Sequence, residues 1–283
     1  MKVTKYNGEL VDYSPKALKI SLTKSGASKE EVEEVFELMS KDIYDGIGTQ
    51  DLYNLAFESL KRYRNSYAAR YSLKKALRDL GPEGYYFEKY IKRLMESVGF
   101  QAVNGQTVQG DAVTHEIDVI AQKDEVLYFC ECKFRNDIDA KISVTTPMYF
   151  MSRMIDVKNR TFTYFGKTLH PTKGFLVTNA YLTSDSVDWA KHYNIGMISW
   201  DYPDQMSLKY LIDNLAIYPV TCLTSLTKEQ HKVLMDAGCL LVKDILNQED
   251  YLKSLKLPNH IIDQLVEEAN ELIAIDTIEC VIQ

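Results

Sequence analysis

Three charged side chains in the middle of the sequence have the types and the spacing that metal-assisted cleavage of a phosphodiester requires. Asp118 stands thirteen positions before Glu131, and Lys133 follows Glu131 by two. Two carboxylates can bind a hard divalent ion such as Mg²⁺, with waters and a phosphate completing its shell. The ion would polarise the phosphate and activate a water molecule, and the lysine would stabilise the developing negative charge. The spacing therefore predicts Asp118 and Glu131 as catalytic ligands of Mg²⁺ or Mn²⁺, and Lys133 as a catalytic residue.

The surrounding residues predict a β-hairpin that brings these side chains together. An apolar, β-branched stretch over 117–121 is broken only by Asp118, and a second apolar run covers 126–134. The polar residues between them fit a short hairpin connection. Because side chains alternate faces along a strand, Glu131 and Lys133 share one face. With the turn centred in the polar segment, Asp118 lies opposite Glu131, roughly 5 Å away at the β-carbons.

A solvated hairpin face with an ordinary ion pair is the alternative interpretation of the same residues. Exposed ion pairs are common and contribute little to stability. Here the flanking residues are strongly apolar, so the charges interrupt strands that would otherwise be buried. A buried charge is costly unless it is paired or bound to a metal ion, which favours a functional site.

Elements on both sides of the hairpin complete a known pattern. An amphipathic helix opens at residues 86–91 ahead of it, and a strand, a helix and a strand follow at residues 173–179, 186–190 and 195–200. With Asp118, Glu131 and Lys133 as the D–ExK core, residues 82–205 resemble the Mrr-like restriction endonucleases of the PD-(D/E)xK superfamily. The resemblance implies an α/β core, a mixed sheet flanked by helices.

The same resemblance implies DNA as the substrate and one further site residue. Glu88 matches a glutamate that faces the metal in that family, which makes it a third metal ligand and catalytic residue. A glutamate near a helix start also simply favours the helix dipole. Arg135, and less strongly Arg153, are candidates for contacts with the DNA backbone, whereas His115 is expected to point away from Asp118. Cutting both strands with one site per chain implies a homodimer or a higher oligomer.

Residues 1–81 predict a hairpin followed by four helices. The hairpin turns at Asn7-Gly8. Helix-start signals stand at Ser14-Pro15, at Ser28 with Glu31, and at Thr49, and the fourth helix covers about residues 66–79. This order, with the V-x-K-x-N-G phrase of the hairpin, resembles the ATP-cone, a mostly helical nucleotide-binding regulatory domain.

The ATP-cone resemblance implies binding of ATP or dATP by basic residues near the hairpin. Lys5 matches the family, and Lys16 and Lys19 flank the position of a family lysine. The sequence departs from the family at Tyr6, where an arginine is usual, and at Ala17, where that lysine is expected. A degenerate cone that serves DNA contact or dimerisation is the alternative.

The C-terminal residues 220–283 predict a small domain of short helices. Their layout resembles helix-hairpin-helix DNA-binding modules, but the link at 257–259 lacks the glycine-rich hairpin of those modules. Residues 221–283 also carry a net charge of −6. A packing or protein-interaction role is therefore the preferred interpretation.

Composition limits the remaining function classes. The 283-residue chain has a net charge of −7, which argues against a protein that coats DNA without a specific site. Between residues 61 and 78 seven basic side chains occur with no acidic one, a run that fits either a DNA contact or a solvated helix surface. The five scattered cysteines, the last being Cys280, fit a reducing compartment, and no stretch approaches a membrane span. We therefore expect a cytoplasmic protein.

Two functions remain open from the sequence. The first is an Mg²⁺-dependent DNA endonuclease, residues 82–219, that ATP or dATP regulates through an N-terminal cone. The second is a catalytically silent DNA-binding or nucleotide-responsive regulator that keeps the nuclease fold. The intact set of two acids and a lysine favours the first.

Overall fold

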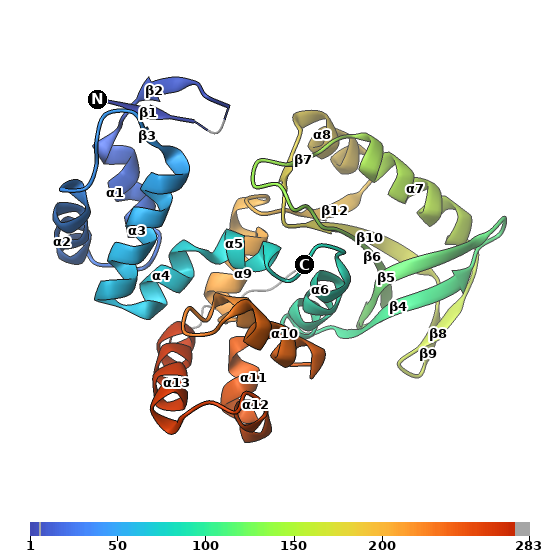
Figure 1. Cartoon of the computed structure of the whole chain (residues 1–283). Helices are drawn as coiled ribbons and strands as arrows, with labels where there is room; N and C mark the ends of the chain where they lie inside the picture. Colours follow the sequence, from blue (N-terminus) through green and yellow to red (C-terminus); the bar gives the residue numbers. More distant parts are fainter. Residues whose placement is uncertain (6, 275–283) are drawn as a thin grey trace.

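A five-stranded mixed sheet forms the right-hand side of the molecule in Figure 1. The computed structural model describes residues 1–5 and 7–274, so Tyr6 and Cys280 lie outside the described residues. The strand order is β12-β10-β6-β5-β4, in which β4, β5 and β6 are antiparallel and β6, β10 and β12 are parallel. The strands are β4 (Gln101–Gln109), β5 (Thr114–Lys123), β6 (Val126–Lys133), β10 (Pro171–Thr178) and β12 (Ile195–Ile198). The predicted α/β core with a mixed sheet is confirmed.

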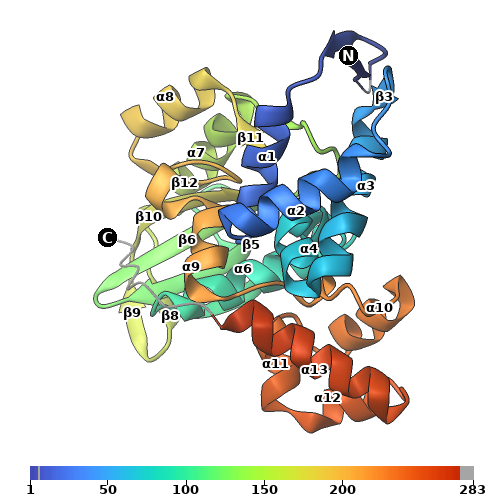
Figure 2. The same cartoon turned by 90° about the vertical axis from the view of Figure 1, so that its left-hand side faces the viewer.

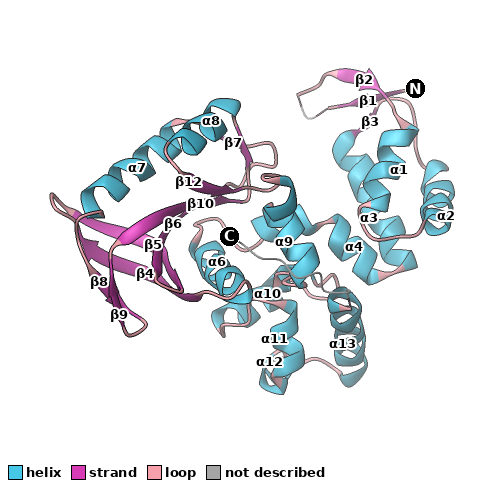
Figure 3. Cartoon of the chain, turned by 180° about the vertical axis from the view of Figure 1, so that it is seen from behind, coloured by secondary structure: helices cyan, strands magenta, loops and turns pink. Residues whose placement is uncertain are grey.

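Helices cover both faces of this sheet. Helix α6 (Tyr85–Ser97) lies on one face, and α7 (Thr145–Val157) and α8 (Ser184–His192) lie on the other (Figure 3). Helices α7 and α8 lie in the connections from β6 to β10 and from β10 to β12, as parallel strands require. Two small strand pairs are added, β7 (Lys141–Ile142) with β11 (Tyr181–Leu182), and β8 (Phe162–Tyr164) with β9 (Lys167–Leu169).

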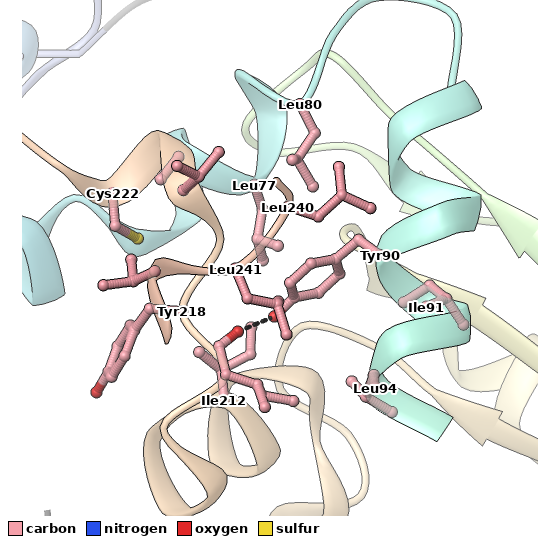
Figure 4. Packing of buried hydrophobic residues seen from close by; sticks show 14 of the residues in the cluster. Leu77, Leu80, Tyr90, Ile91, Leu94, Ile212, Tyr218, Cys222, Leu240 and Leu241 are labelled. Atoms are coloured by element: carbon pink, nitrogen blue, oxygen red, sulfur yellow. Dashed lines mark hydrogen bonds between the residues drawn. The ribbon is translucent and has the colours of Figure 1, made fainter. Parts of the chain in front are cut away.

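Helix α6 presents one strongly apolar side to the core. Its fully buried residues recur at helical spacing: Phe87, Tyr90, Ile91, Leu94 and Met95. They pack with Val119 and Cys130 of the sheet and with residues far along the chain, such as Leu240 and Leu241 (Figure 4). The Tyr90 hydroxyl donates to the carbonyl of Ile217 at 2.7 Å. Helix α6 is therefore the element that joins the sheet to the C-terminal third of the chain.

The N-terminal residues form a unit with its own core. Leu22, Val35, Met39 and Leu60 are buried there in a cluster separate from that of α6. Its elements are β1 (Lys2–Thr4), β2 (Leu10–Asp12), β3 (Ile47–Gly48), α1 (Pro15–Thr23), α2 (Lys29–Ser40), α3 (Thr49–Tyr63), α4 (Asn65–Tyr71) and α5 (Leu73–Arg78). The predicted hairpin, the Ser14 cap and the Ser28–Glu31 capping box are confirmed.

Two predictions within this unit were wrong. Thr49 is the first helical residue and Gly48 is the N-cap, because β3 pairs with β1 and keeps the chain extended up to Gly48. The predicted fourth helix is two helices, since Ser72 leaves helical geometry and its hydroxyl donates to the carbonyl of Ala69. The break lets Tyr67 and Ala68 pack in the N-terminal core while Leu73 and Leu77 pack in the main core.

The C-terminal residues form short helices, as predicted. They are α10 (Lys228–Asp236), α11 (Val242–Asn247), α12 (Glu249–Ser254) and α13 (Asn259–Ile273), and they follow α9 (Leu208–Leu215) and two 3₁₀ turns, Asp204–Met206 and Val220–Cys222. Figure 2 shows them below the sheet and beside α4. Their apolar residues belong to the same cluster as those of α6. The boundary at residue 219 stays a prediction, but it does not separate two hydrophobic cores.

Polar contacts reinforce this packing. Arg93 of α6 donates two hydrogen bonds to Asp244, at 3.1 and 2.8 Å, and the carboxylate of the buried Glu268 accepts from the backbone N–H groups of Thr224 and Ser225. Bidentate arginine–carboxylate pairs are among the stronger contacts of this kind. The C-terminal helices therefore pack against α6, and a protein-interaction role for them stays a prediction.

Three of the seven basic side chains between residues 61 and 78 make hydrogen bonds to other parts of the protein. They donate to backbone carbonyls elsewhere in the chain: Lys61 to Thr224 (3.1 Å), Arg70 to Glu271 (3.3 Å) and Lys74 to Ile138 (2.6 Å). Neither a free DNA-binding surface nor a fully solvated helix describes these three side chains. They tie the N-terminal unit to the rest of the chain.

Cys130, Cys132, Cys222 and Cys239 are buried and form no disulfide bonds. Over residues 1–5 and 7–274, no helix is long and apolar enough to cross a membrane.

We expect Tyr90→Phe to lower the free energy of unfolding by about 1–3 kcal/mol, because the buried carbonyl of Ile217 then has no donor. Urea denaturation of the full chain measures this. Tyr44→Phe is the control, since Tyr44 is exposed and its change should leave the midpoint unaltered. Equal midpoints for both variants would contradict the role of the Tyr90 hydroxyl.

Candidate active site

The pairing of β5 with its two neighbours is interrupted at Asp118. The ladder with β6 runs from Lys123↔Val126 to Val119↔Cys130 and ends there, so Asp118 is the next residue, opposite Glu131. On the other side, β5 pairs with β4 before and after Asp118, but the intervening residue of β4, Gly105, has a φ of +64° that favours glycine. The predicted register is confirmed, and the site lies where the strands separate.

We call the point where β5 and β6 separate, beside Asp118 and Glu131, the strand fork. There the Asp118 carboxylate accepts a backbone N–H of β6 that no longer has a partner in the β5–β6 ladder. Its Oδ2 accepts the N–H of Cys132 at 2.6 Å, one residue beyond the end of the ladder. Strand β6 instead continues its parallel pairing with β10 through Glu131 and Lys133. Alternation then directs Cys130 and Cys132 into the core under α6, as predicted, and leaves Glu131 on the opposite face.

Both acids of the fork are withdrawn from water. Glu131 is 7% exposed and Asp118 is partly buried. Burial raises the pKa of Glu131, and the neighbouring Asp118 carboxylate raises it further, while Arg153 and Lys133 act in the opposite direction. Burial also raises the pKa of Asp118, against the N–H of Cys132 and the charges of Arg153 and Lys133. The arrangement therefore demands positive charge beside the two carboxylates.

Glu88 belongs to the same electrostatic cluster. It lies in the first turn of α6, whose N-cap Gly84 has a φ of +83°. Partial burial raises the pKa of Glu88 to about 7, and Asp118, Glu116 and Glu131 contribute in that order. A carboxyl group with this pKa can accept or release a proton near neutral pH.

The donor set suits a hard divalent ion held in part by water and substrate. Among the residues that the structure describes, no three acidic, histidine or cysteine side chains form a ready-made metal cage. Asp118 and Glu131 nevertheless offer oxygen ligands, and burial is the main cause that raises the pKa of each. One or two carboxylates with waters and phosphate are the usual shell of Mg²⁺. Metal binding by Asp118 and Glu131, with Glu88 as a third ligand, stays a prediction.

Arg153 has a closer relation to the site than the sequence indicated. Its guanidinium donates to Glu131 Oε2 at 2.7 Å and to the carbonyl of Glu116 at 3.0 Å. The sequence offered it only as a weak candidate for a DNA contact. Its place depends on how α7 crosses the sheet, which residue spacing does not reveal.

Two further residues missed by the sequence analysis support the end of β6. The Thr178 hydroxyl donates to the carbonyl of Lys133, and the Asn179 amide exchanges two hydrogen bonds of 2.8 Å with the backbone of Arg135. The polar end of the strand over 173–179 was the available signal. The Arg135 guanidinium itself donates to the carbonyl of Phe134 at 3.0 Å.

His115 contacts α7, the helix that also carries Arg153, and its predicted orientation away from Asp118 stays a prediction. Its Nε2 lies 2.7 Å from Asp156 Oδ2 in α7. The same carboxylate accepts the N–H groups of Ala112 and Val113 in the connection between β4 and β5. His115 therefore fixes that connection to α7.

The three predicted nucleotide-binding lysines lie in the N-terminal unit. Lys5 pairs with Glu9 at 3.0 Å, Lys19 pairs with Glu33, and Lys16 is exposed. Lys19 also lies over the ring of Phe36, 4.4 Å from its centroid. Acidic neighbours already occupy two of the three lysines.

Comparison with known proteins identifies the type of the central domain. Residues 81–204 match the restriction endonuclease family, and residues 218–273 match a family described as AF1548-like, C-terminal. An uncharacterized protein of Archaeoglobus fulgidus is 29% identical over 184 residues, which are 65% of this chain and 99% of that protein. The crystal structure of the protein of unknown function AF1548 is 28% identical, with a TM-score of 0.54, over 67% of this chain and 97% of that one.

A further solved structure is more distant. Can2 from Sulfobacillus thermosulfidooxidans in complex with cyclic tetra-adenylate is 18% identical, with a TM-score of 0.33, over 71% of this chain and 56% of that one. At that TM-score it supports no conclusion. The family match and the mixed sheet together give residues 81–204 a restriction-endonuclease-like fold, and the match indicates a nuclease domain. Neither finding bears on the ATP-cone.

We expect Glu88→Gln to stabilise the protein increasingly as the pH rises. The folded-state pKa of Glu88 is about 7, above its ordinary value of 4.5, so folding binds a proton between these values and stability falls as the pH rises through that range. Glutamine cannot ionise and escapes this loss. The gain should be near zero at pH 4 and on the order of 1 kcal/mol at pH 8, after screening of the half-exposed group.

Urea denaturation in metal-free buffer at the two pH values measures this difference. Glu83→Gln is the control, because Glu83 is exposed in the connection before α6. A pH-independent difference between Glu88→Gln and wild type would show that the carboxyl does not titrate as described.

Proposed function

We propose that this protein is a divalent-metal-dependent DNA endonuclease that hydrolyses phosphodiester bonds. The observation that carries the proposal is the strand fork, where the β5–β6 ladder ends beside Asp118 and burial raises the pKa of both Asp118 and Glu131 next to the charges of Arg153 and Lys133. The match to the restriction endonuclease family supports it independently. Two sites are needed to cut both strands, so we propose a homodimer or a higher oligomer.

Each residue of the fork has a defined task in this proposal. Asp118 and Glu131 would hold Mg²⁺ or Mn²⁺, and Glu88 would complete the shell. When bound, such an ion polarises the scissile phosphate and lowers the pKa of the attacking water. Lys133, whose carbonyl is fixed by Thr178, would orient that water and stabilise charge on the phosphate. Glu88 could take up a proton near neutral pH.

We expect Lys133→Met to reduce the cleavage rate roughly 10²- to 10³-fold with Mg²⁺, because a preorganised positive charge is lost from the transition state. Plasmid nicking by the full chain measures the rate. Lys173→Met, an exposed lysine of β10, is the control and should cut like wild type. If Lys133→Met and wild type cut equally across duplex, branched and single-stranded DNA, the enzyme proposal fails.

The silent regulator remains the competing function, and one result would favour it. That result is strong DNA binding without cleavage in any metal, unaffected by Asp118→Ala.

We further propose that the N-terminal unit binds ATP or dATP and regulates cleavage. Its separate core and its ties to the rest of the chain, such as Lys74 to Ile138, support a regulatory unit. The pair of Lys5 with Glu9 is exposed and of little energetic value, so a phosphate group could replace Glu9 at low cost.

We expect heat in a calorimetric titration with ATP or dATP, and loss of about tenfold in affinity in Lys5→Ala, which corresponds to one charge-assisted phosphate contact. Lys41→Ala, an exposed lysine after α2, is the control. No heat with either nucleotide would exclude the regulatory proposal and leave the nuclease proposal intact.

A further inference from the structure

We propose that Arg153 is a positioning residue of the active site that exchanges partners. Before metal binds, its guanidinium holds the Glu131 carboxylate. When a divalent ion takes that carboxylate, Arg153 turns to a phosphate oxygen of the substrate. This inference deepens the proposed nuclease function and rests on it.

The contacts of Arg153 give it the place of a counter-ion at the fork. One guanidinium nitrogen lies 2.7 Å from Glu131 Oε2 and 3.0 Å from the carbonyl oxygen of Glu116. Glu131 is 7% exposed, so this contact is shielded from water on the carboxylate side. Removing one partner of such a shielded pair is strongly unfavourable, because it leaves a buried charge uncompensated.

The guanidinium and a metal ion compete for the same oxygen. A divalent ion bound to Glu131 would bring two positive charges next to a group that already carries one. Like charges at such separations repel by at least about 1 kcal/mol even at the dielectric constant of water, and by more in a partly buried site. Arg153 must therefore leave Glu131, at least in part, when the ion binds.

The side of the guanidinium away from Glu131 contacts Tyr149. The other terminal nitrogen lies 3.3 Å from the Tyr149 hydroxyl, and the guanidinium carbon lies 4.9 Å from the centroid of the Tyr149 ring. Tyr149 is 59% exposed and precedes Arg153 by one turn of α7, so the pair faces the surface where a substrate would approach. A cation over an aromatic face keeps its charge available.

The unused hydrogen-bonding capacity of Arg153 points to an anion with several oxygens. Its Nε is buried and has no hydrogen-bond partner among the described residues. A guanidinium presents its N–H groups in a planar fork that matches phosphate in a bidentate manner. A phosphodiester beside the metal would satisfy this nitrogen together with the terminal one.

Binding of Mn²⁺ to the full chain, measured by calorimetry without DNA, tests the exchange. We expect Arg153→Gln to bind Mn²⁺ about tenfold more tightly than wild type, equivalent to about 1.4 kcal/mol of relieved competition. Arg160→Gln is the matched control, because Arg160 pairs with Asp111 at 2.9 Å on the surface, and it should bind Mn²⁺ like wild type.

The phosphate contact is tested with uncleaved duplex DNA in Ca²⁺, by fluorescence anisotropy. Arg153→Gln should bind DNA about tenfold more weakly, opposite in sign to its effect on Mn²⁺. Arg153→Lys keeps the positive charge but loses the planar set of N–H donors of a guanidinium. Mn²⁺ affinity should therefore stay near wild type while DNA affinity still falls. This second variant preserves a partner for Glu131 and guards against misfolding of Arg153→Gln.

The outcomes separate this inference from the nuclease proposal. Opposite changes in Mn²⁺ and DNA affinity without cleavage of any DNA would support the exchange and count against the nuclease. Unchanged or weaker Mn²⁺ binding in Arg153→Gln, or no Mn²⁺ binding by any variant, would overturn the exchange. Parallel losses of both affinities would assign Arg153 a merely structural role and overturn it as well.

Discussion

Asp118 and Glu131 place two carboxylates at the end of a strand pair, where both are largely shielded from water. Such a pair repels itself and loses hydration, so it needs cations or protons close by. Lys133 and Arg153 supply charge to this pair, and the pKa of Glu88, raised to about 7, lets a third carboxyl stay partly protonated near neutral pH. The negative charge of the fork therefore governs which groups surround it and explains its suitability for a metal ion.

Helix α6 and the C-terminal helices support the strand fork from the opposite face of the sheet. The face of the sheet that carries Val119 and Cys130 is covered by α6, which is in turn fixed by the C-terminal helices through Tyr90 and Arg93. The acidic C-terminal segment is therefore an extension of the core. Residues 218–273 of this segment match the AF1548-like, C-terminal family.

The N-terminal unit is attached differently. Its core is separate, and the helix break at Ser72 divides α4, which packs within the unit, from α5, which packs on the main core. Lys74 on α5 donates to the carbonyl of Ile138, in the segment that follows β6. Helix α5 therefore links the N-terminal unit to the chain beyond Lys133.

The sequence alone determined the hairpin and its register, because alternation along a strand and a short polar turn fix these locally. It also located the starts of α1 and α2, through the Ser14 cap and the Ser28–Glu31 box. Only the tertiary structure decided that Arg153 contacts Glu131, that Thr178 and Asn179 hold the end of β6, and that Arg70 donates to the carbonyl of Glu271. These contacts join residues 22 or more positions apart, and their geometry depends on how helices cross the sheet, which no local pattern encodes.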